Sequence, residues 1–157
     1  MIKIKIACVG GIKEKFFIDA IDEYKKRLGR FCTLSVVEVE EESKQQNIQK
    51  KIDIESERLL SVSSGSLVLL DRIGQMVSSE DLAEHLKQSQ TGGVSEITFI
   101  IGGSNGVNEK LKKACNKVIS FGKITFPHQL FRVVLLEQIY RAFTINAGMP
   151  YHKWVLM

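Results

Sequence analysis

The chain has few of the residues that build disulfide frameworks and metal sites. Its 157 residues include three cysteines and three histidines: Cys8, Cys32, Cys115, His85, His128 and His152. The cysteines are odd in number and widely spaced, so the sequence predicts neither a disulfide framework nor a zinc site of the usual ligand spacing. We expect each cysteine to pack as a small apolar side chain. The histidines have no cysteine or carboxylate partner at ligand spacing, and we therefore expect no metal.

Long apolar runs are also missing. No segment approaches the roughly 18 to 20 apolar residues of a membrane span. The opening Met-Ile-Lys-Ile-Lys-Ile alternates polar and apolar residues and lacks the apolar core of a signal peptide. We therefore expect a protein of the reducing cytoplasm with no membrane partner.

Size and charge place the chain among ordinary globular proteins. At 157 residues it has the length of one domain, spanning 1–157, and 44% of its residues are apolar. The net charge is +4 and the sequence pI is near 9.0. A mildly basic protein can bind a polyanion such as RNA, but the charge alone does not require one.

Strand patterns alternate with helix patterns along most of the chain. Alternating or continuous apolar residues predict strands over 2–9, 33–39, 67–70 and 97–101. Apolar residues at helical spacing predict helices over 13–28, 48–63, 79–91 and 108–117, with Ser78 or Ser79 as one cap. A loop and a short strand are expected within 121–126. This order predicts an α/β fold with a parallel sheet of five to six strands covered by helices.

Four segments directly follow predicted strands: Gly10-Gly11, 70–74, 102–106 and 121–126. Ligands of open parallel sheets bind beyond the carboxyl ends of the strands, so these segments are candidates for one small-molecule pocket. Each could equally be a tight turn without a ligand. The spacing of Gly-x-Gly-x-x-Gly and the Gly-Lys-Ser/Thr of a P-loop are absent, which argues against dinucleotide and P-loop sites.

The last helix is apolar on more than one face. From Leu130 to Phe143 it carries too many apolar residues for a single stripe against one sheet. Such a helix needs two partners, and the second could be another subunit. The alternative is a helix buried centrally within one chain. We expect a homodimer through this C-terminal helix.

Several motifs resemble the RlmH family of SPOUT-class methyltransferases, which act on 23S ribosomal RNA. They are Leu-Asp-Arg-Ile-Gly at 70–74, Ile-Gly-Gly-Ser-Asn-Gly at 101–106, Thr-Phe-Pro-His at 125–128, Arg-Val-Val-Leu-Leu-Glu-Gln-Ile-Tyr-Arg-Ala at 132–142 and Pro-Tyr-His-Lys at 150–153. The resemblance covers essentially the whole chain. The sequence departs from the family at its C-terminus: members usually stop just after Tyr-His-Lys, whereas here residues 154–157, Trp-Val-Leu-Met, follow.

This resemblance implies a fold, a reaction and partners. The fold would be an α/β-knot whose C-terminal part forms a trefoil knot, a rare exception to unknotted topology. S-adenosyl-L-methionine would bind in the knot of a homodimer. The reaction would methylate N3 of a pseudouridine at position 1915, in the helix 69 loop of 23S rRNA, on the assembled 70S ribosome. A non-catalytic RNA-binding or ribosome-binding factor is one rival hypothesis, and an enzyme using another nucleotide is a second.

Carried over by motif, the resemblance also implies binding residues. Those expected to bind the cofactor are Leu70, Gly102, Phe121, Gly122, Lys123, Ile124, Thr125 and Phe126, with Leu70 and Ile124 packing the adenine. Five cations are candidates for an RNA-binding surface shared across the dimer: Lys13, Lys15, Arg132, Arg141 and Lys153.

Three residues are catalytic candidates. His128, or the Tyr151-His152 pair, would help remove the N3 proton or position the base, because histidine titrates in the required range. Alternatively, His128 caps the last helix and His152 contacts phosphate.

Overall fold

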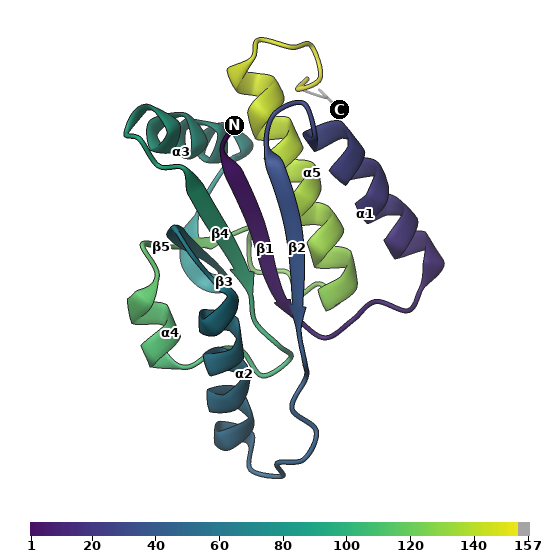
Figure 1. The fold of residues 1–157 in the computed structure, drawn as a ribbon, viewed down its shortest axis with the longest axis vertical. Helices are drawn as coiled ribbons and strands as arrows, with labels where there is room; N and C mark the ends of the chain where they lie inside the picture. The colour runs from purple at the N-terminus through teal and green to yellow at the C-terminus, as the bar shows by residue number, and fades with distance from the viewer. Residues whose placement is uncertain (154–157) are drawn as a thin grey trace.

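The computed structural model describes residues 1–153, and the C-terminal extension 154–157 lies outside them. Five parallel strands form one sheet in the order β2-β1-β4-β3-β5 (Figure 1). The strands are β1 (Lys3–Val9), β2 (Thr33–Val39), β3 (Ser66–Met76), β4 (Glu96–Ile101) and β5 (Lys117–Ser120). The predicted α/β class and parallel sheet are confirmed, with five strands in the described residues and no sixth.

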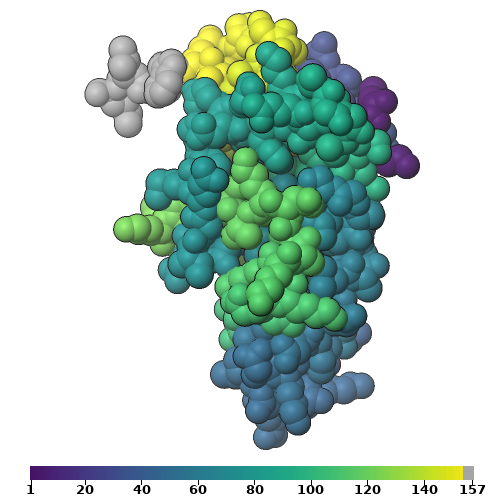
Figure 2. Space-filling view, turned by 90° about the vertical axis from the view of Figure 1, so that its left-hand side faces the viewer, coloured from purple at the N-terminus to yellow at the C-terminus, as the bar shows by residue number. Residues whose placement is uncertain are grey.

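Helices cover both faces of the sheet (Figure 1). They are α1 (Lys15–Leu28), α2 (Ile48–Val62), α3 (Ser79–Thr91), α4 (Glu109–Ala114) and α5 (His128–Asn146). Helices α1 and α3 both pack against α5 on one face, while α2 and α4 contact each other on the other face. Figure 2 shows the edge of the molecule where α3, α4 and α2 follow one another from top to bottom.

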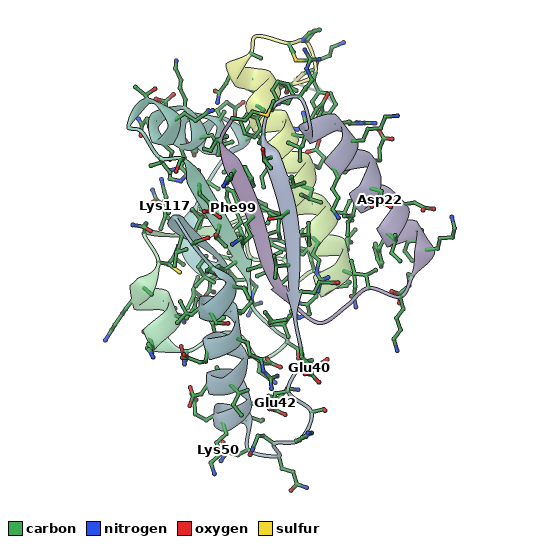
Figure 3. All side chains as sticks on the ribbon, viewed as in Figure 1. Asp22, Glu40, Glu42, Lys50, Phe99 and Lys117 are labelled. Carbon is green, nitrogen blue, oxygen red and sulfur yellow. The ribbon has the colours of Figure 1, made fainter. Side chains whose placement is uncertain are left out.

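The side chains of β1 alternate between the two faces of the sheet and contribute to a core on each face. Ile4 and Ile6 are fully buried in the core shared with α1, α3 and α5, whereas Ala7 and Val9 belong to a smaller core beneath α2 and α4. Successive side chains of a strand point to opposite faces, so one strand supplies both cores. Phe99 in β4 is likewise buried, near the middle of the sheet (Figure 3).

Local sequence sets several helix boundaries. Ser78 caps α3 by accepting a hydrogen bond from the Asp81 amide, and the Asp81 carboxylate accepts one from the Ser78 amide. This reciprocal arrangement satisfies two donors that the first helical turn would otherwise leave unpaired. Of the two serines predicted as possible caps, Ser78 is the N-cap of α3.

Two predicted boundaries near the C-terminal half are wrong. The helix expected over 108–117 ends at Ala114, because Asn116 exchanges two hydrogen bonds of 2.8 Å with the backbone of Leu67. That pairing draws the chain into β5, so the short strand expected within 121–126 instead occupies 117–120. Strand β3 also continues beyond Leu70 to Met76, with an irregularity in its pairing to β5 between Leu70 and Gln75.

Helix α5 finds its second partner within the chain. It lies between α1 and α3 and buries Leu135, Leu136 and Ile139 completely or nearly so. Phe31, in the turn between α1 and β2, stacks on Phe143 with ring centroids 5.4 Å apart. The apolar character of α5 is therefore accounted for by packing inside one subunit, and the homodimer stays a prediction.

Candidate active site

A cavity of about 400 Å³ opens at the carboxyl ends of β4 and β5, beside residues 69–72 of β3. We call it the glycine-turn pocket, because the turn 102–106 forms one wall. The segment 69–72 and the loop after β5 form the others. Its lining residues are Leu69, Leu70, Asp71, Arg72, Ile101, Gly102, Gly103, Ser104, Asn105, Gly106, Val107, Phe121, Gly122, Ile124, Thr125, Phe126, His128 and Phe131.

The glycines of the turn allow two close contacts. A Cβ on Gly102 would lie 2.7 Å from Cγ1 of Val107, and a Cβ on Gly103 would lie 2.6 Å from Oε1 of Glu55. Any side chain at these positions would push a neighbour aside, so the turn packs only because both residues are glycine. Both glycines also line the pocket.

A buried serine holds the loop after β5 in place. The Ser120 hydroxyl lies 3.1 Å from the carbonyl oxygens of Arg72 and Gly122, to either of which it can donate. The same oxygen accepts a hydrogen bond of 3.0 Å from the Gly122 amide. Gly122 has a φ of 114°, a conformation that side-chain-bearing residues rarely adopt. Arg72 adds a second link by donating to Oγ1 of Thr125 at 3.1 Å.

Aromatic rings close the pocket on the α5 side. Phe131 contacts both Phe121 and Phe126, with centroid separations of 5.5 Å in each pair. Ile124 lies in the loop wall and is 72% exposed. The pocket therefore combines apolar walls with the backbone polar groups of two glycine-bearing loops, the composition typical of small-molecule sites.

The structure brings together most of the predicted cofactor residues. Seven of the eight line the glycine-turn pocket: Leu70, Gly102, Phe121, Gly122, Ile124, Thr125 and Phe126. Lys123 is exposed and does not line it. Sequence reasoning missed Val107 and Phe131, for which apolar spacing indicated only helix packing. Asp71 and Arg72 also line the pocket, and they belong to the segment 70–74 that the sequence marked as a candidate because it follows an apolar strand.

A second cavity, of about 390 Å³, adjoins the first. We call it the β1-loop pocket, because Val9, Gly10, Gly11, Lys13 and Glu14 form much of its lining. Glu41 and Gln129 also line it. The two pockets share Gly103, Ser104 and His128. A group bound at His128 can therefore face both cavities.

Arg132 has a role different from the one predicted. Its side chain is 2% exposed, and its guanidinium donates to Glu38 Oε2 at 2.7 Å and to the carbonyl oxygens of Val9 and Gly10 at 2.8 and 2.7 Å. A cation enclosed in this way cannot contact a phosphate in this conformation. Its assignment to an RNA-binding surface is therefore corrected: Arg132 fastens α5 to the end of β1.

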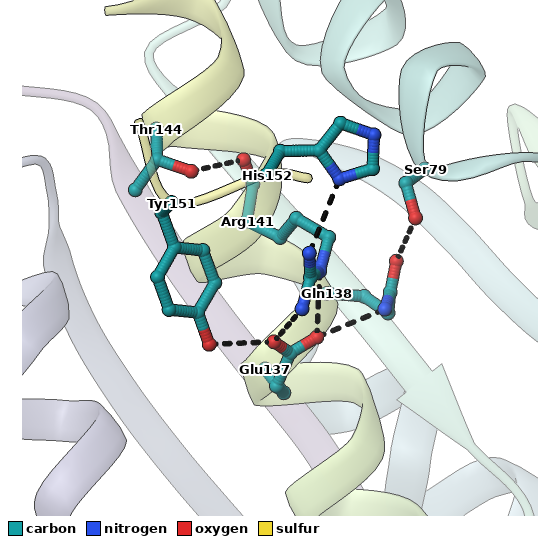
Figure 4. A network of polar contacts seen from close by, with 7 residues as sticks. All are labelled: Ser79, Glu137, Gln138, Arg141, Thr144, Tyr151 and His152. Atoms are coloured by element: carbon teal, nitrogen blue, oxygen red, sulfur yellow. Dashed lines mark hydrogen bonds and ion pairs between the residues drawn. The ribbon is translucent and has the colours of Figure 1, made fainter. Parts of the chain in front are cut away.

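A separate network at the C-terminal end of α5 contains three further candidates, Arg141, Tyr151 and His152 (Figure 4). Arg141 donates to both carboxylate oxygens of Glu137, and the Tyr151 hydroxyl donates to Glu137 at 2.8 Å. Arg141 also donates to Nδ1 of His152 at 3.1 Å, which leaves Nε2 to donate to Glu80 at 2.8 Å. Thirteen residues of helix separate His128 from Arg141, about 20 Å at 1.5 Å per residue.

Burial and hydrogen bonds in this network shift the pKa values of two of its residues. Burial raises the pKa of Tyr151, and its hydrogen bond to Glu137 raises it further, so the phenol stays protonated at neutral pH. The hydrogen bond from His152 lowers the pKa of Glu80. In one subunit, neither Tyr151 nor His152 lines the two pockets that His128 lines. Lys153 is exposed at the same end, whereas exposed Lys13 lines the β1-loop pocket and exposed Lys15 begins the adjacent helix.

The cysteines behave as the sequence predicts. Cys8 and Cys32 are buried and Cys115 is half-buried, and all three are free thiols. Burial raises the pKa of each to about 11, so they are neutral near pH 7. Among residues 1–153, no cluster of three or more histidine, cysteine or acidic side chains is placed to hold a metal ion. Within the same residues no helix combines the length and apolarity of a membrane span.

Comparison with known proteins identifies the family. Residues 2–152 match the family model described as "Predicted SPOUT methyltransferase". The chain belongs to the SPOUT methyltransferase family. It is 50% identical over 157 residues to "Ribosomal RNA large subunit methyltransferase H" of Lactobacillus helveticus, an alignment covering 96% of this chain and 99% of that protein. The protein of the same name from Caldicellulosiruptor saccharolyticus is 47% identical over 154 residues, with the same coverage of both chains.

Solved structures show the same fold at low sequence identity. A putative methylase family protein from Neisseria gonorrhoeae superimposes with a TM-score of 0.54 at 12% identity, over 99% of this chain and 88% of that one. A probable methylase family protein from Haemophilus influenzae gives a TM-score of 0.53 at 14% identity, over 98% of this chain and 72% of that one. These likenesses support the fold alone.

The cofactor of this SPOUT methyltransferase is S-adenosyl-L-methionine. The glycine-turn pocket fits such a molecule. Its volume of about 400 Å³ lies in the range of small-molecule sites, and both turn glycines, Gly102 and Gly103, line it. Leu70 and Ile124 offer apolar surface for a flat ring, and the loop backbones offer hydrogen-bonding groups.

Proposed function

We propose that this protein transfers a methyl group from S-adenosyl-L-methionine to N3 of a pseudouridine in helix 69 of large-subunit ribosomal RNA. The observation that carries the proposal is the pair of adjoining pockets that share His128, one suited to the cofactor and one open to a substrate. The name of the relatives at 47–50% identity, ribosomal RNA large subunit methyltransferase H, supports the substrate class.

The protein's part in this reaction is to bind, orient and remove a proton. When bound, S-adenosyl-L-methionine supplies a methyl group on a positively charged sulfur, so no covalent nucleophile from the protein is needed. Leu70 and Ile124 hold the adenine, and the backbones of Gly102 and the 121–126 loop hold the polar parts. Holding both reactants in adjoining cavities provides the orientation on which the rate depends.

His128 is the residue best placed to accept the N3 proton. It lines both cavities, and no side-chain hydrogen bond occupies its ring within the described residues. In contrast, the phenol of Tyr151 already donates to Glu137, and both ring nitrogens of His152 are engaged. We therefore assign proton removal to His128 and a positioning role to the network around Glu137.

A homodimer through α5 would reunite these two sets of residues. A two-fold axis perpendicular to a helix places the start of one copy beside the end of the other, so His128 of one subunit would approach the Tyr151 end of its partner. Four exposed apolar side chains, from the second half of β3, the loop after β5 and the start of α5, suit such an interface: Ile73, Met76, Ile124 and Leu130. Sedimentation analysis of the wild type and an Ile73→Glu/Ile124→Glu variant tests the dimer, and a monomeric wild type contradicts it.

We also infer that the C-terminal part is threaded as a trefoil knot. The loop after β5 lines the same pocket as the 102–106 turn and the segment 69–72, and the chain then enters α5, which packs against α1 and α3. An experimental electron-density trace from Val68 to Asn146 checks this threading. An unthreaded trace refutes it.

Two experiments test the function. Calorimetry with S-adenosyl-L-methionine and with S-adenosyl-homocysteine measures cofactor binding, which a non-catalytic RNA-binding factor would lack. Tritiated methyl transfer is then measured into 70S ribosomes, isolated subunits and naked 23S rRNA, and the modified nucleotide is located by nuclease digestion and mass spectrometry. We expect 3-methylpseudouridine in helix 69 of 70S ribosomes. Cofactor binding with transfer to no RNA would overturn the proposal.

His128→Ala and His152→Ala separate the two histidines in the same assay. We expect the single-turnover rate at saturating RNA to fall about 100-fold for His128→Ala, the usual scale for a lost general base. His152→Ala should act mainly on RNA affinity. A His128→Ala rate near wild type would remove His128 from proton transfer.

A further inference from the structure

A methyltransferase acting on pseudouridine must distinguish it from uridine, and the two bases differ in one donor. In uridine the sugar is attached to N1, whereas in pseudouridine it is attached to C5 and N1 carries a hydrogen. Shape therefore discriminates little between them, and the selective contact has to be an acceptor for N1–H. This inference rests on the function proposed above and concerns the β1-loop pocket.

The β1-loop pocket is suited to a neutral base and not to a phosphate. Two carboxylates, Glu14 and Glu41, line it, against a single lysine, Lys13. A phosphate in this cavity would be repelled by both carboxylates, whereas a pyrimidine can donate its N–H groups to them. The wall at His128 is shared with the glycine-turn pocket, so a base bound here can present N3 toward the cofactor.

The carboxylates near this pocket differ in how far their oxygens are already engaged. Glu38 binds Arg132 at 2.7 Å and Glu41 pairs with Lys51 at 3.4 Å. The side chain of Glu14 makes no hydrogen bond or ion pair within residues 1–153, although it stands at the N-cap position of α1. An exposed acceptor that the fold leaves unused, at the wall of a substrate-sized cavity, is available to the substrate.

We propose that the Glu14 carboxylate accepts a hydrogen bond from N1–H of the target pseudouridine and makes the enzyme selective for pseudouridine over uridine. Glu14 is a specificity-determining residue in this role and takes no part in proton transfer at N3. A charge-assisted hydrogen bond at a partly exposed site is expected to contribute about tenfold to the preference.

The experiment compares three acceptors in ribosomes that differ only at the target position: pseudouridine, uridine and N1-methylpseudouridine. Single-turnover methyl transfer at saturating S-adenosyl-L-methionine gives the rate ratio of pseudouridine to uridine for each variant. We expect Glu14→Ala to lower this ratio about tenfold and Glu14→Gln, whose amide oxygen can still accept, to keep most of it. Because alanine also vacates space beside N1, Glu14→Ala should methylate the N1-methyl acceptor faster than the wild type does.

Two matched variants complete the test. Asp22→Ala removes an exposed carboxylate further along α1 and should leave the ratio unchanged. Glu41→Ala removes the other carboxylate of the pocket, and a loss of selectivity there but not in Glu14→Ala would overturn the assignment. An unchanged ratio in Glu14→Ala, or a wild type that does not prefer pseudouridine, also refutes it while leaving methyl transfer intact. A wild type that methylates no RNA instead refutes the proposed function.

Discussion

Arg132 and Glu38 lie 94 residues apart in the chain, yet Nη1 of the arginine is 2.7 Å from Oε2 of the glutamate. The other terminal nitrogen of Arg132 donates to the carbonyl oxygens of Val9 and Gly10. These contacts join the second turn of α5 to the carboxyl ends of β1 and β2. They also fix His128, one turn earlier in α5, with respect to the loop that lines the β1-loop pocket.

Replacing Arg132 by methionine should destabilise the fold. The change removes a cation that satisfies two backbone carbonyls and a carboxylate, and we expect a loss of about 3 kcal/mol in the free energy of unfolding, typical for breaking a buried pair. Glu38→Gln should cost less, because that side chain is 45% exposed and its partner keeps both carbonyls. Urea unfolding measures both, with exposed Lys87→Met as the control. Equal stability of Arg132→Met and the control would contradict the anchoring role.

The glycine turn predicts a paired effect on cofactor affinity. In Gly102→Ala the new methyl group would lie 2.7 Å from Cγ1 of Val107, so the turn must shift and S-adenosyl-L-methionine should bind at least tenfold more weakly. Val107→Ala removes the atom that clashes, so the double variant should recover most of the affinity. Calorimetry on the wild type, both single variants and the double variant checks this. Full affinity in Gly102→Ala would exclude the close approach as a requirement.

His85 predicts a pH dependence of stability. It is half-buried, and its Nε2 is buried without a hydrogen-bond partner in the described residues. Burial lowers the pKa of His85 and the nearby Lys117 lowers it further. The unfolded state therefore takes up a proton first as the pH falls, and the stability that depends on neutral His85 is lost below about pH 6.5.

Thermal unfolding between pH 7.5 and pH 5.5 tests this prediction. The melting temperature should fall more for the wild type than for His85→Gln, which cannot be protonated. Parallel curves would show that His85 does not contribute. Measuring the same pH dependence of the melting temperature for Lys117→Met gives the smaller contribution of the Lys117 charge to the lowered pKa of His85.

Lys13 and Lys15 predict the salt dependence of RNA binding. With Arg132 buried, these two exposed lysines are the predicted RNA-binding residues nearest the β1-loop pocket. Removing one lysine that binds a phosphate should reduce the slope of log affinity against log salt by about 1, so the Lys13→Ala/Lys15→Ala variant should show a slope reduced by about 2. Binding titrations at several salt concentrations measure this, with Lys87→Ala as a matched control. An unchanged slope in the double variant would remove both lysines from the RNA interface.

The sequence by itself determined the order of strands and helices and pointed to the segments that line the glycine-turn pocket. Apolar alternation predicted the strands, and the rule that ligands lie beyond the carboxyl ends of parallel strands pointed to the segments 70–74, 102–106 and 121–126, parts of which line one cavity. Both kinds of inference depend on local patterns and on a general property of parallel sheets. They do not require knowledge of which distant side chains meet.

Only the tertiary structure decided the partners of the charged residues. Arg132 and Arg141 occupy the same helix and look alike in sequence, yet one is enclosed by the end of β1 and the other binds Glu137, Tyr151 and His152 (Figure 4). Likewise, the placement of His128 between two cavities depends on where α5 begins relative to Gly103 and Ser104. Whether a long cationic side chain is buried, and what it binds, depends on contacts between residues far apart in the chain. Local periodicity contains no information about those contacts.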